Sequence, residues 1–206
     1  QVGHVIHKVN DPSQAVTDFE ARGLVVEYGT VKKPHNALIY FSHGPCPELW
    51  RARECRRSWG ACFVVTARGA ARRFLFWDRG PEGLCGLCLE DDDSELEEGM
   101  TRLNGRGLHI KTKRMDPRAR ELRYEVLFPH DVDPPFLVSH VSTGPGPQDF
   151  THPKGTAPIT RVAYPLPVHE RDTVRGLNDD QRLEFVKPGQ AIKVTFDDDG
   201  VLYKPL

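Results

Sequence analysis

The sequence predicts an α+β fold built from a repeated β-α-β-β-β unit. Short apolar runs bounded by Gly, Pro, Asn or Asp are typical of strands, and runs with apolar residues three or four apart are typical of helices. These runs come in the same order twice, within residues 1–50 and within residues 83–141. The residues before each helix also match, because Val9-Asn10-Asp11 in the first unit parallels Leu89-Glu90-Asp91 in the second. An internal duplication of this kind is informative about the fold.

The first unit opens with a strand at residues 2–9. A helix follows, with Asp11 as its N-cap, Pro12 in the first helical position and Gln14 completing a capping box. Gly23 ends this helix, because glycine readily adopts the left-handed conformation found there. Three strands are then expected, at residues 24–28, 37–41 and 48–50.

The second unit follows a connecting segment at residues 51–82. We predict that the aromatic-rich part of this segment, residues 58–77, is largely helical and packs on the sheet. The unit itself starts with a strand at 84–89 and a helix that begins at Asp93 or Ser94. Three strands are expected after this helix, at residues 108–113, 122–128 and 136–141.

The remaining residues predict a loop and a shorter third copy of the unit. Residues 142–157 are rich in Gly, Pro, Thr and Ser, which is typical of a surface loop. The third copy, of β-α-β-β type, falls within residues 152–206, and residues 1–206 are expected to form one domain. Its elements are expected at 159–164, 170–177, 182–186 and 191–196, followed by an Asp198-Asp199-Gly200 turn and a strand at 201–203.

The composition argues against several functional classes. The net charge is −1 and the isoelectric point is about 6.8, so no overall field attracts nucleic acid or an acidic membrane. No apolar run approaches the roughly 20 residues of a membrane-spanning helix. The five cysteines are an odd number without the spacing of a secreted disulfide framework, which favours a reduced, cytoplasmic location. Cys85 and Cys88 form a C-x-x-C in a predicted strand; we expect core packing, with redox or metal work as the alternative.

Two residues of the first unit favour a metal-centred active site. His4 lies in the first strand, and Glu48 lies in the last apolar run of the unit. A carboxylate in such a run would be costly to bury without a partner. An imidazole and a carboxylate together suit a divalent ion such as Fe, Mn, Zn, Ni or Co. The pair therefore predicts a divalent metal ion as cofactor, with an ordinary satisfied polar role for each residue as the alternative.

The repeated unit and five short motifs resemble the vicinal oxygen chelate superfamily and, more narrowly, its glyoxalase-like domain proteins. The chain departs from the usual pattern of these proteins at Gly3, where an acidic residue is typical, and at Lys154, where asparagine is typical. The pair before Asn36 also differs, because Pro34-His35 replaces two small residues. The five motifs are Gly3-His4-Val5, His35 to Phe41, Pro47-Glu48-Leu49, Pro135-Phe136-Leu137-Val138 and His152-Pro153-Lys154-Gly155.

The resemblance implies a curved, cup-like mixed β-sheet with flanking helices, in which His4 and Glu48 lie side by side over the cup. The second unit does not supply a matching pair, because residues 84–88 contain no His, Glu or Gln. The resemblance therefore implies an asymmetric metal site, completed by a histidine from residues 140–152. We rank His152 first as the third metal ligand and assign a catalytic role to His140; His35, Asn36 and Trp50 are expected to bind the substrate.

The function implied is a glyoxalase- or dioxygenase-like metalloenzyme that acts on a small oxygenated molecule by lyase, isomerase or oxygenase chemistry. The expected partner is a small-molecule substrate, with neither nucleic acid nor membrane, and pairing of modules between chains would give a homodimer. Two alternatives remain open on the same fold. One is a metal-free protein that binds or sequesters a small molecule, and the other is a metal-free biosynthetic cyclase or isomerase.

Overall fold

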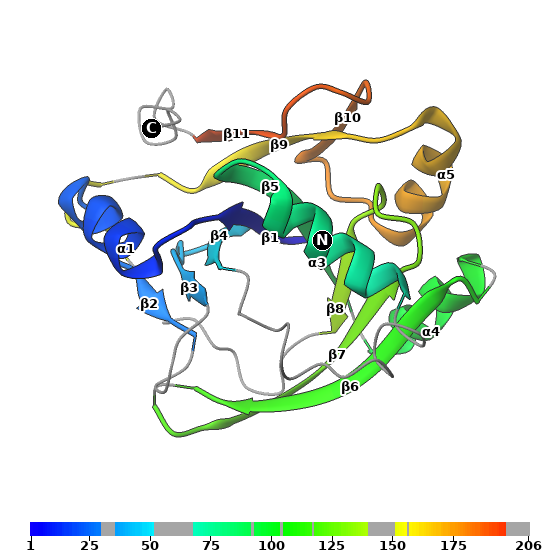
Figure 1. The fold of residues 1–206 in the computed structure, drawn as a ribbon, viewed down its shortest axis with the longest axis horizontal. Coiled ribbons are helices and arrows are strands. Elements are labelled where there is room, and N and C mark those ends of the chain that lie inside the picture. The colour runs from blue at the N-terminus through cyan, green and yellow to red at the C-terminus, as the bar shows by residue number, and fades with distance from the viewer. Residues whose placement is uncertain are drawn as a thin grey trace.

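The main feature of the fold is a curled eight-stranded sheet, with strand order β2-β3-β4-β1-β5-β8-β7-β6 (Figure 1). The structure is a computed structural model, and it describes residues 1–29, 36–51, 68–91, 93–103, 105–116, 118–139, 151–155 and 157–196. The strands of this sheet are β1 (Val2–Lys8), β2 (Glu27–Tyr28), β3 (Asn36–Leu38), β4 (Cys46–Trp50), β5 (Gly83–Asp91), β6 (Gly107–Met115), β7 (Glu121–Pro129) and β8 (Phe136–Ser139).

Helices and a smaller sheet accompany the main sheet. The smaller sheet has the strand order β10-β9-β11. Along the outside of the curve lie α1, α4, α5 and this small sheet (Figure 1). The remaining elements are α1 (Pro12–Ala21), α3 (Arg68–Arg79), α4 (Asp93–Arg102), β9 (Ile159–Pro165), α5 (Val168–Leu177), β10 (Leu183–Val186) and β11 (Lys193–Phe196).

The predicted fold class is confirmed, because each half of the main sheet has the β-α-β-β-β order. In the first half β1 pairs in parallel with β4, and in the second half β5 pairs in parallel with β8. The two halves join where β1 and β5 run antiparallel at the centre. No described helix is long and apolar enough to cross a membrane.

The register at the centre shows that the two halves are related by an approximate two-fold rotation. His4 pairs with Cys88, and Ile6 pairs with Gly86. For an axis through the Val5–Leu87 pair, in the middle of this ladder, exchange of the two strands maps His4 onto Gly86 and Ile6 onto Cys88. Because Ile6 also pairs with Glu48, and Cys88 with Phe136, the counterpart of Glu48 in the second half is Phe136.

The first helix is capped largely as the sequence predicts. The Asp11 side chain accepts hydrogen bonds from the backbone N–H groups of Ser13 and Gln14, at 2.9 and 3.1 Å. Gly23 follows the helix with a φ of +90°, a left-handed conformation that favours glycine. The prediction of a capping box is wrong, because the Gln14 side chain donates to Asp18 Oδ1 at 2.8 Å instead of bonding to the N-cap residue.

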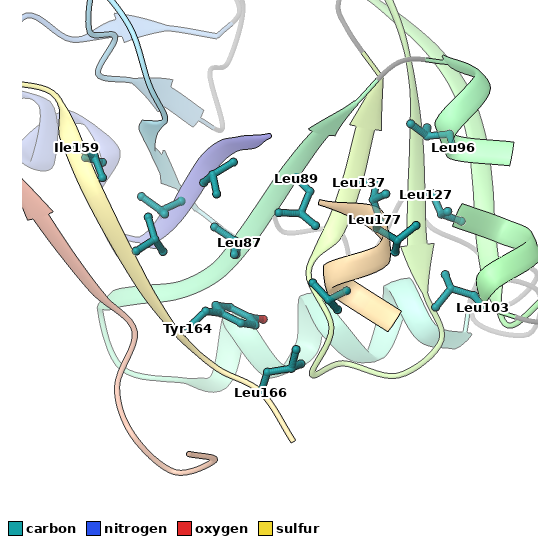
Figure 2. Close-up of a cluster of buried hydrophobic side chains, with 14 of the residues drawn as sticks. Leu87, Leu89, Leu96, Leu103, Leu127, Leu137, Ile159, Tyr164, Leu166 and Leu177 are labelled. Carbon is teal, nitrogen blue, oxygen red and sulfur yellow. The ribbon is translucent and has the colours of Figure 1, made fainter. Parts of the chain in front are cut away.

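The outer face of the main sheet carries the larger core. Leucines of β5, α4, β7 and β8 meet residues of β9 and α5 there (Figure 2). Burying such side chains contributes roughly 1.5–3 kcal/mol each before the opposing loss of chain entropy. The residues labelled in Figure 2 are Leu87, Leu89, Leu96, Leu103, Leu127, Leu137, Ile159, Tyr164, Leu166 and Leu177.

The inner, concave face carries a second cluster, which α3 helps to form. Trp77 of α3 is 3% exposed, and a Cβ on Gly86 of β5 would lie only 2.4 Å from its ring. The predicted helical segment thus packs on the sheet over residues 68–79, while residues 52–67 lie outside the described residues. The buried members of this inner cluster are Ile6, Ala70, Trp77, Cys88, Val126, Phe128, Phe136 and Val138.

Polar contacts fix α3 and the two ends of the sheet. Lys8 is 7% exposed, and its Nζ donates to the carbonyl oxygens of Asp78 and Gly80, where the C-terminus of α3 carries partial negative charge. Arg114, near the end of β6, donates to the carbonyl oxygen of Gly29, just after β2. These contacts hold the helix inside the curve and bring the far ends of the sheet together.

Candidate functional site

His4 and Glu48 meet on the inner face of the sheet. His4 pairs in register with Cys46, and Ile6 pairs with Glu48, so the two side chains come from adjacent parallel strands. His4 Nε2 lies 3.1 Å from Glu48 Oε2. Their side chains keep exposures of 20% and 13%, so the pair is shielded but still open to a small molecule.

Asn36 holds the second oxygen of Glu48. The Asn36 Nδ2 group donates to Glu48 Oε1 at 2.7 Å. Asn36 pairs in register with Trp50 on β4, two residues beyond Glu48, which puts the amide and the carboxylate on one face. With one oxygen facing His4 and the other bound to Asn36, the carboxylate has a fixed orientation.

The electrostatics of the pair favour a protonated His4. Burial alone lowers the pKa of His4, but Cys88 and the Glu48 carboxylate more than offset it, so the pKa lies well above its ordinary value. Burial also raises the pKa of the Cys88 thiol. Glu48 is the carboxylate that faces His4, at 3.1 Å, and a protonated His4 forms an ion pair with it.

The spacing of the pair suits two ligands of one metal ion. Two ligand atoms about 2.1 Å from an ion and at right angles lie about 3 Å apart. The described residues, however, contain no group of three or more His, Cys, Asp and Glu side chains that could hold a metal ion. The described residues alone therefore do not complete a metal site.

His152 lies away from this pair, against the outer, α1 side of the sheet. Its ring is 2% exposed and packs edge-on against Phe41, with centroids 4.9 Å apart. Its Nδ1 accepts a hydrogen bond from the Val25 N–H at 3.1 Å, and burial lowers its pKa. Lys154, two residues on, donates to the carbonyl oxygen of Ala21 at 3.0 Å. The His-Pro segment is thus fixed to the end of α1, and the structure does not bring His152 to His4 and Glu48 as a third ligand.

The other predicted site residues have different outcomes. Trp50 lies on the inner face, where it stacks on Phe74 with ring centroids 5.9 Å apart and meets Trp77 edge-on at 5.6 Å. One of its faces is therefore used in packing. His35 and His140 lie outside the described residues.

The three cysteines among the described residues, Cys46, Cys85 and Cys88, are structural in character. Cys85 and Cys88 both pack with the inner cluster, because an irregularity in the β1–β5 register at Ile6 and His7 breaks the regular alternation. Burial raises the pKa of Cys85 to about 12, and of Cys46 to the same value. A buried thiol that stays protonated is a poor nucleophile, so core packing is the reading that fits.

The second half of the sheet contributes apolar groups where the first contributes His4 and Glu48. The counterpart of Glu48 is Phe136, whose ring lies edge-on to the His4 ring at 5.7 Å. The counterpart of His4 is Gly86, and the space beside it is filled by Trp77. The alignment of Asp11 with Asp91 does not locate these residues, because it places Leu84, two positions before Gly86, opposite His4.

A polar cleft of about 390 Å³ lies elsewhere, between α3, the β7–β8 turn and α5. Its charges largely face one another: Arg106 Nη1 lies 3.7 Å from Asp131 Oδ2, and His169 Nε2 lies 3.6 Å from Glu170 Oε1. It contains none of the predicted site residues.

Comparison with protein families decides the family. A family profile described as a glyoxalase-like domain matches residues 2–175. The chain belongs to the glyoxalase-like domain family. This confirms the resemblance to the vicinal oxygen chelate superfamily that the motifs predicted. Among curated protein sequences no match was found for this glyoxalase-like protein.

Several solved structures match the chain at low sequence identity. A hypothetical protein from Staphylococcus aureus has a TM-score of 0.57 and 14% identity, and the match covers 97% of this chain and 82% of that one. A methylmalonyl-CoA epimerase from Streptomyces coelicolor, in complex with 2-nitronate-propionyl-CoA, has a TM-score of 0.43 and 16% identity, with coverage of 71% and 98%. The epimerase from Mycobacterium tuberculosis gives 0.40 and 18%, with coverage of 71% and 89%. At 14% identity the glyoxalase-like chain shares a fold with the Staphylococcus aureus protein and no more.

Proposed function

We propose that this glyoxalase-like protein is an enzyme in which the His4–Glu48 pair moves a proton on a small oxygenated molecule. The observation that carries the proposal is the 3.1 Å contact between His4 Nε2 and Glu48 Oε2 on a concave, partly exposed face. A carboxylate held by Asn36 at 2.7 Å is already oriented, so little ordering is needed before it reacts.

The pair suits the enolisation of a carbonyl compound. The oxygen and the α-carbon of such a compound lie about 2.4 Å apart, so one molecule can meet Nε2 and Oε2 together. Glu48 accepts the proton from the α-carbon, while the His4 imidazolium donates a hydrogen bond to the carbonyl oxygen as negative charge develops on it. Return of the proton to another position or face gives isomerase chemistry, and loss of a leaving group from the enolate gives lyase chemistry.

A divalent metal ion on the same two residues is the second candidate, and the ligand-like spacing of the pair favours it. When bound, such an ion would act as a Lewis acid toward the substrate oxygen. His4 can ligate only as neutral imidazole, so its raised pKa means that binding must release a proton.

The test uses a panel of small enolisable carbonyl compounds in D₂O. The exchange of their α-protons for deuterium is monitored by NMR. Glu48→Gln should slow exchange at least 100-fold, within the range for a general base, and His4→Gln should slow it as well. The matched control is Glu125→Gln, because Glu125 Oε2 faces His109 Nε2 at 2.6 Å on the outer face and should have no effect.

Two further outcomes separate the candidates. Exchange that survives complete removal of metal supports the metal-free pair, and exchange that is lost with metal and restored by one ion supports the metal enzyme. Full exchange by Glu48→Gln would overturn the role of the pair. Saturable binding of a small molecule, without exchange of any compound, would indicate a binding protein instead.

A further inference from the structure

Arg114 is a cation on the inner face that has no role in the proton transfer described above. It lies on β6 in the same alternation as Ile110, which packs with the inner cluster. Its Nη1 donates to the Gly29 carbonyl oxygen, a neutral acceptor. Within the described parts of the chain, no carboxylate lies within ion-pair distance of Arg114, unlike Arg118, whose Nη2 is 3.3 Å from Glu27 Oε2.

Strand neighbours connect Arg114 with the His4–Glu48 pair. Gly29, whose carbonyl oxygen accepts from Arg114, also donates its N–H to the Asn36 carbonyl oxygen at 3.0 Å, and Asn36 holds Glu48. Tyr124, on the neighbouring strand β7, packs with the inner cluster and pairs in register with Thr112, two residues before Arg114. Burial raises the pKa of the Tyr124 phenol, so it remains a neutral hydroxyl group at neutral pH. Arg114 therefore belongs to the same concave face as the pair.

Among the described residues, the other charged groups of this face already have partners. His4 and Glu48 face one another, and the Nζ of Lys8 donates to two carbonyl oxygens at the end of α3. A guanidinium offers several N–H donors in a planar fork, and its hydrogen bond to Gly29 uses one of them. The remaining donors match the geometry of a carboxylate.

We propose that Arg114, together with the Tyr124 hydroxyl, binds the carboxylate group of the substrate. The substrate class is then a small oxo acid, with its carboxylate on Arg114 and its enolisable carbonyl at His4 and Glu48. This inference rests on the proposed function of the pair. Arg114, from the second half of the sheet, would then distinguish charged carbonyl compounds from neutral ones.

The experiment is a calorimetric titration with pyruvate and oxaloacetate, each compared with a neutral counterpart, pyruvamide and dimethyl oxaloacetate. The wild-type protein should bind at least one of the acids and bind its neutral counterpart at least ten-fold more weakly. Arg114→Gln should remove this preference by weakening the acid at least ten-fold, and Arg114→Lys should lie between the two. The matched control is Arg118→Gln, because Arg118 also links the ends of the sheet but its side chain is 46% exposed and already paired.

Several results would overturn the assignment. Binding of neither acid by the wild type, equal binding of acid and neutral compound, or full affinity in Arg114→Gln each excludes Arg114 as the carboxylate site. If Arg114→Gln unfolds, Arg114→Lys and Tyr124→Phe replace it, with circular dichroism as the check of folding. Glu48→Gln should keep its affinity for the acid while losing proton exchange, so failure of the proposed reaction is distinguished from failure of the binding site.

Discussion

His7 should lower the free energy of unfolding of the protein in mild acid. It lies on β1, three residues after His4, and turns to the outer face, where its ring meets Phe19 of α1 edge-on with centroids 5.9 Å apart. Burial is the main cause that lowers its pKa to about 4; Glu82 opposes this, and Arg22 adds to the lowering.

The magnitude follows from the difference in pKa between the two states. Unfolded histidine titrates near 6.5 and folded His7 near 4. Below pH 6.5 the unfolded chain therefore binds more protons than the folded one, and the free energy of unfolding falls as pH falls. The loss is complete below pH 4 and amounts to about 3 kcal/mol, at 1.36 kcal/mol for each pKa unit.

The assay is urea denaturation between pH 7 and pH 4 of the wild type and His7→Leu, whose side chain does not titrate. The difference in unfolding free energy between the two should change by about 3 kcal/mol across this range in favour of the variant. His43→Gln is the control, because it removes an exposed histidine that does not pack under α1. Parallel pH profiles for the wild type and His7→Leu would refute the reasoning.

Two further predictions concern the attachment of α3. Gly86→Ala should destabilise the fold by about 1–3 kcal/mol, because the new Cβ would lie 2.4 Å from the Trp77 ring; Gly80→Ala, with nearest contacts of 3.4 Å, is the control in a urea titration. Lys8→Met should lower the free energy of unfolding by about 1–3 kcal/mol, because it leaves the Asp78 and Gly80 carbonyl oxygens without their charged donor. An unchanged midpoint of urea denaturation would contradict this.

Local signals in the sequence predict the elements well and their exact lengths less well. Asp11, Pro12 and Gly23 bound α1 because capping depends only on neighbouring residues. The strand expected at 37–41 spans only Asn36–Leu38 in the structure. One more backbone hydrogen bond follows it, from the Ile39 N–H to the Pro47 carbonyl oxygen at 3.0 Å, and the regular pairing then ends. How far a strand stays paired depends on its partner, which the local pattern does not contain.

The candidate site depended on knowledge of the fold rather than on local pattern. His4 and Glu48 are brought together by the parallel pairing of β1 and β4, which the family resemblance implies. His152 was expected to join them, but contacts with Val25 and Phe41 fix its segment on the outer side. Arg114 gave no signal, because a lone arginine in a strand resembles a solvated residue and its contact with Gly29 spans 85 positions.

The duplication of the fold makes the asymmetry of the site informative. A two-fold scaffold offers equivalent positions for His4 and Glu48 in the second half, and these positions hold Gly86 and Phe136. Trp77 comes from α3, in the connecting segment that the two units do not share, and its ring occupies the space that a side chain at position 86 would need. A symmetric four-ligand site would therefore require a change at Trp77 as well as at both strand positions. The inner face thus has polar side chains from one half and aromatic side chains from the other, and we expect a ligand of the proposed site to contain both polar and apolar groups.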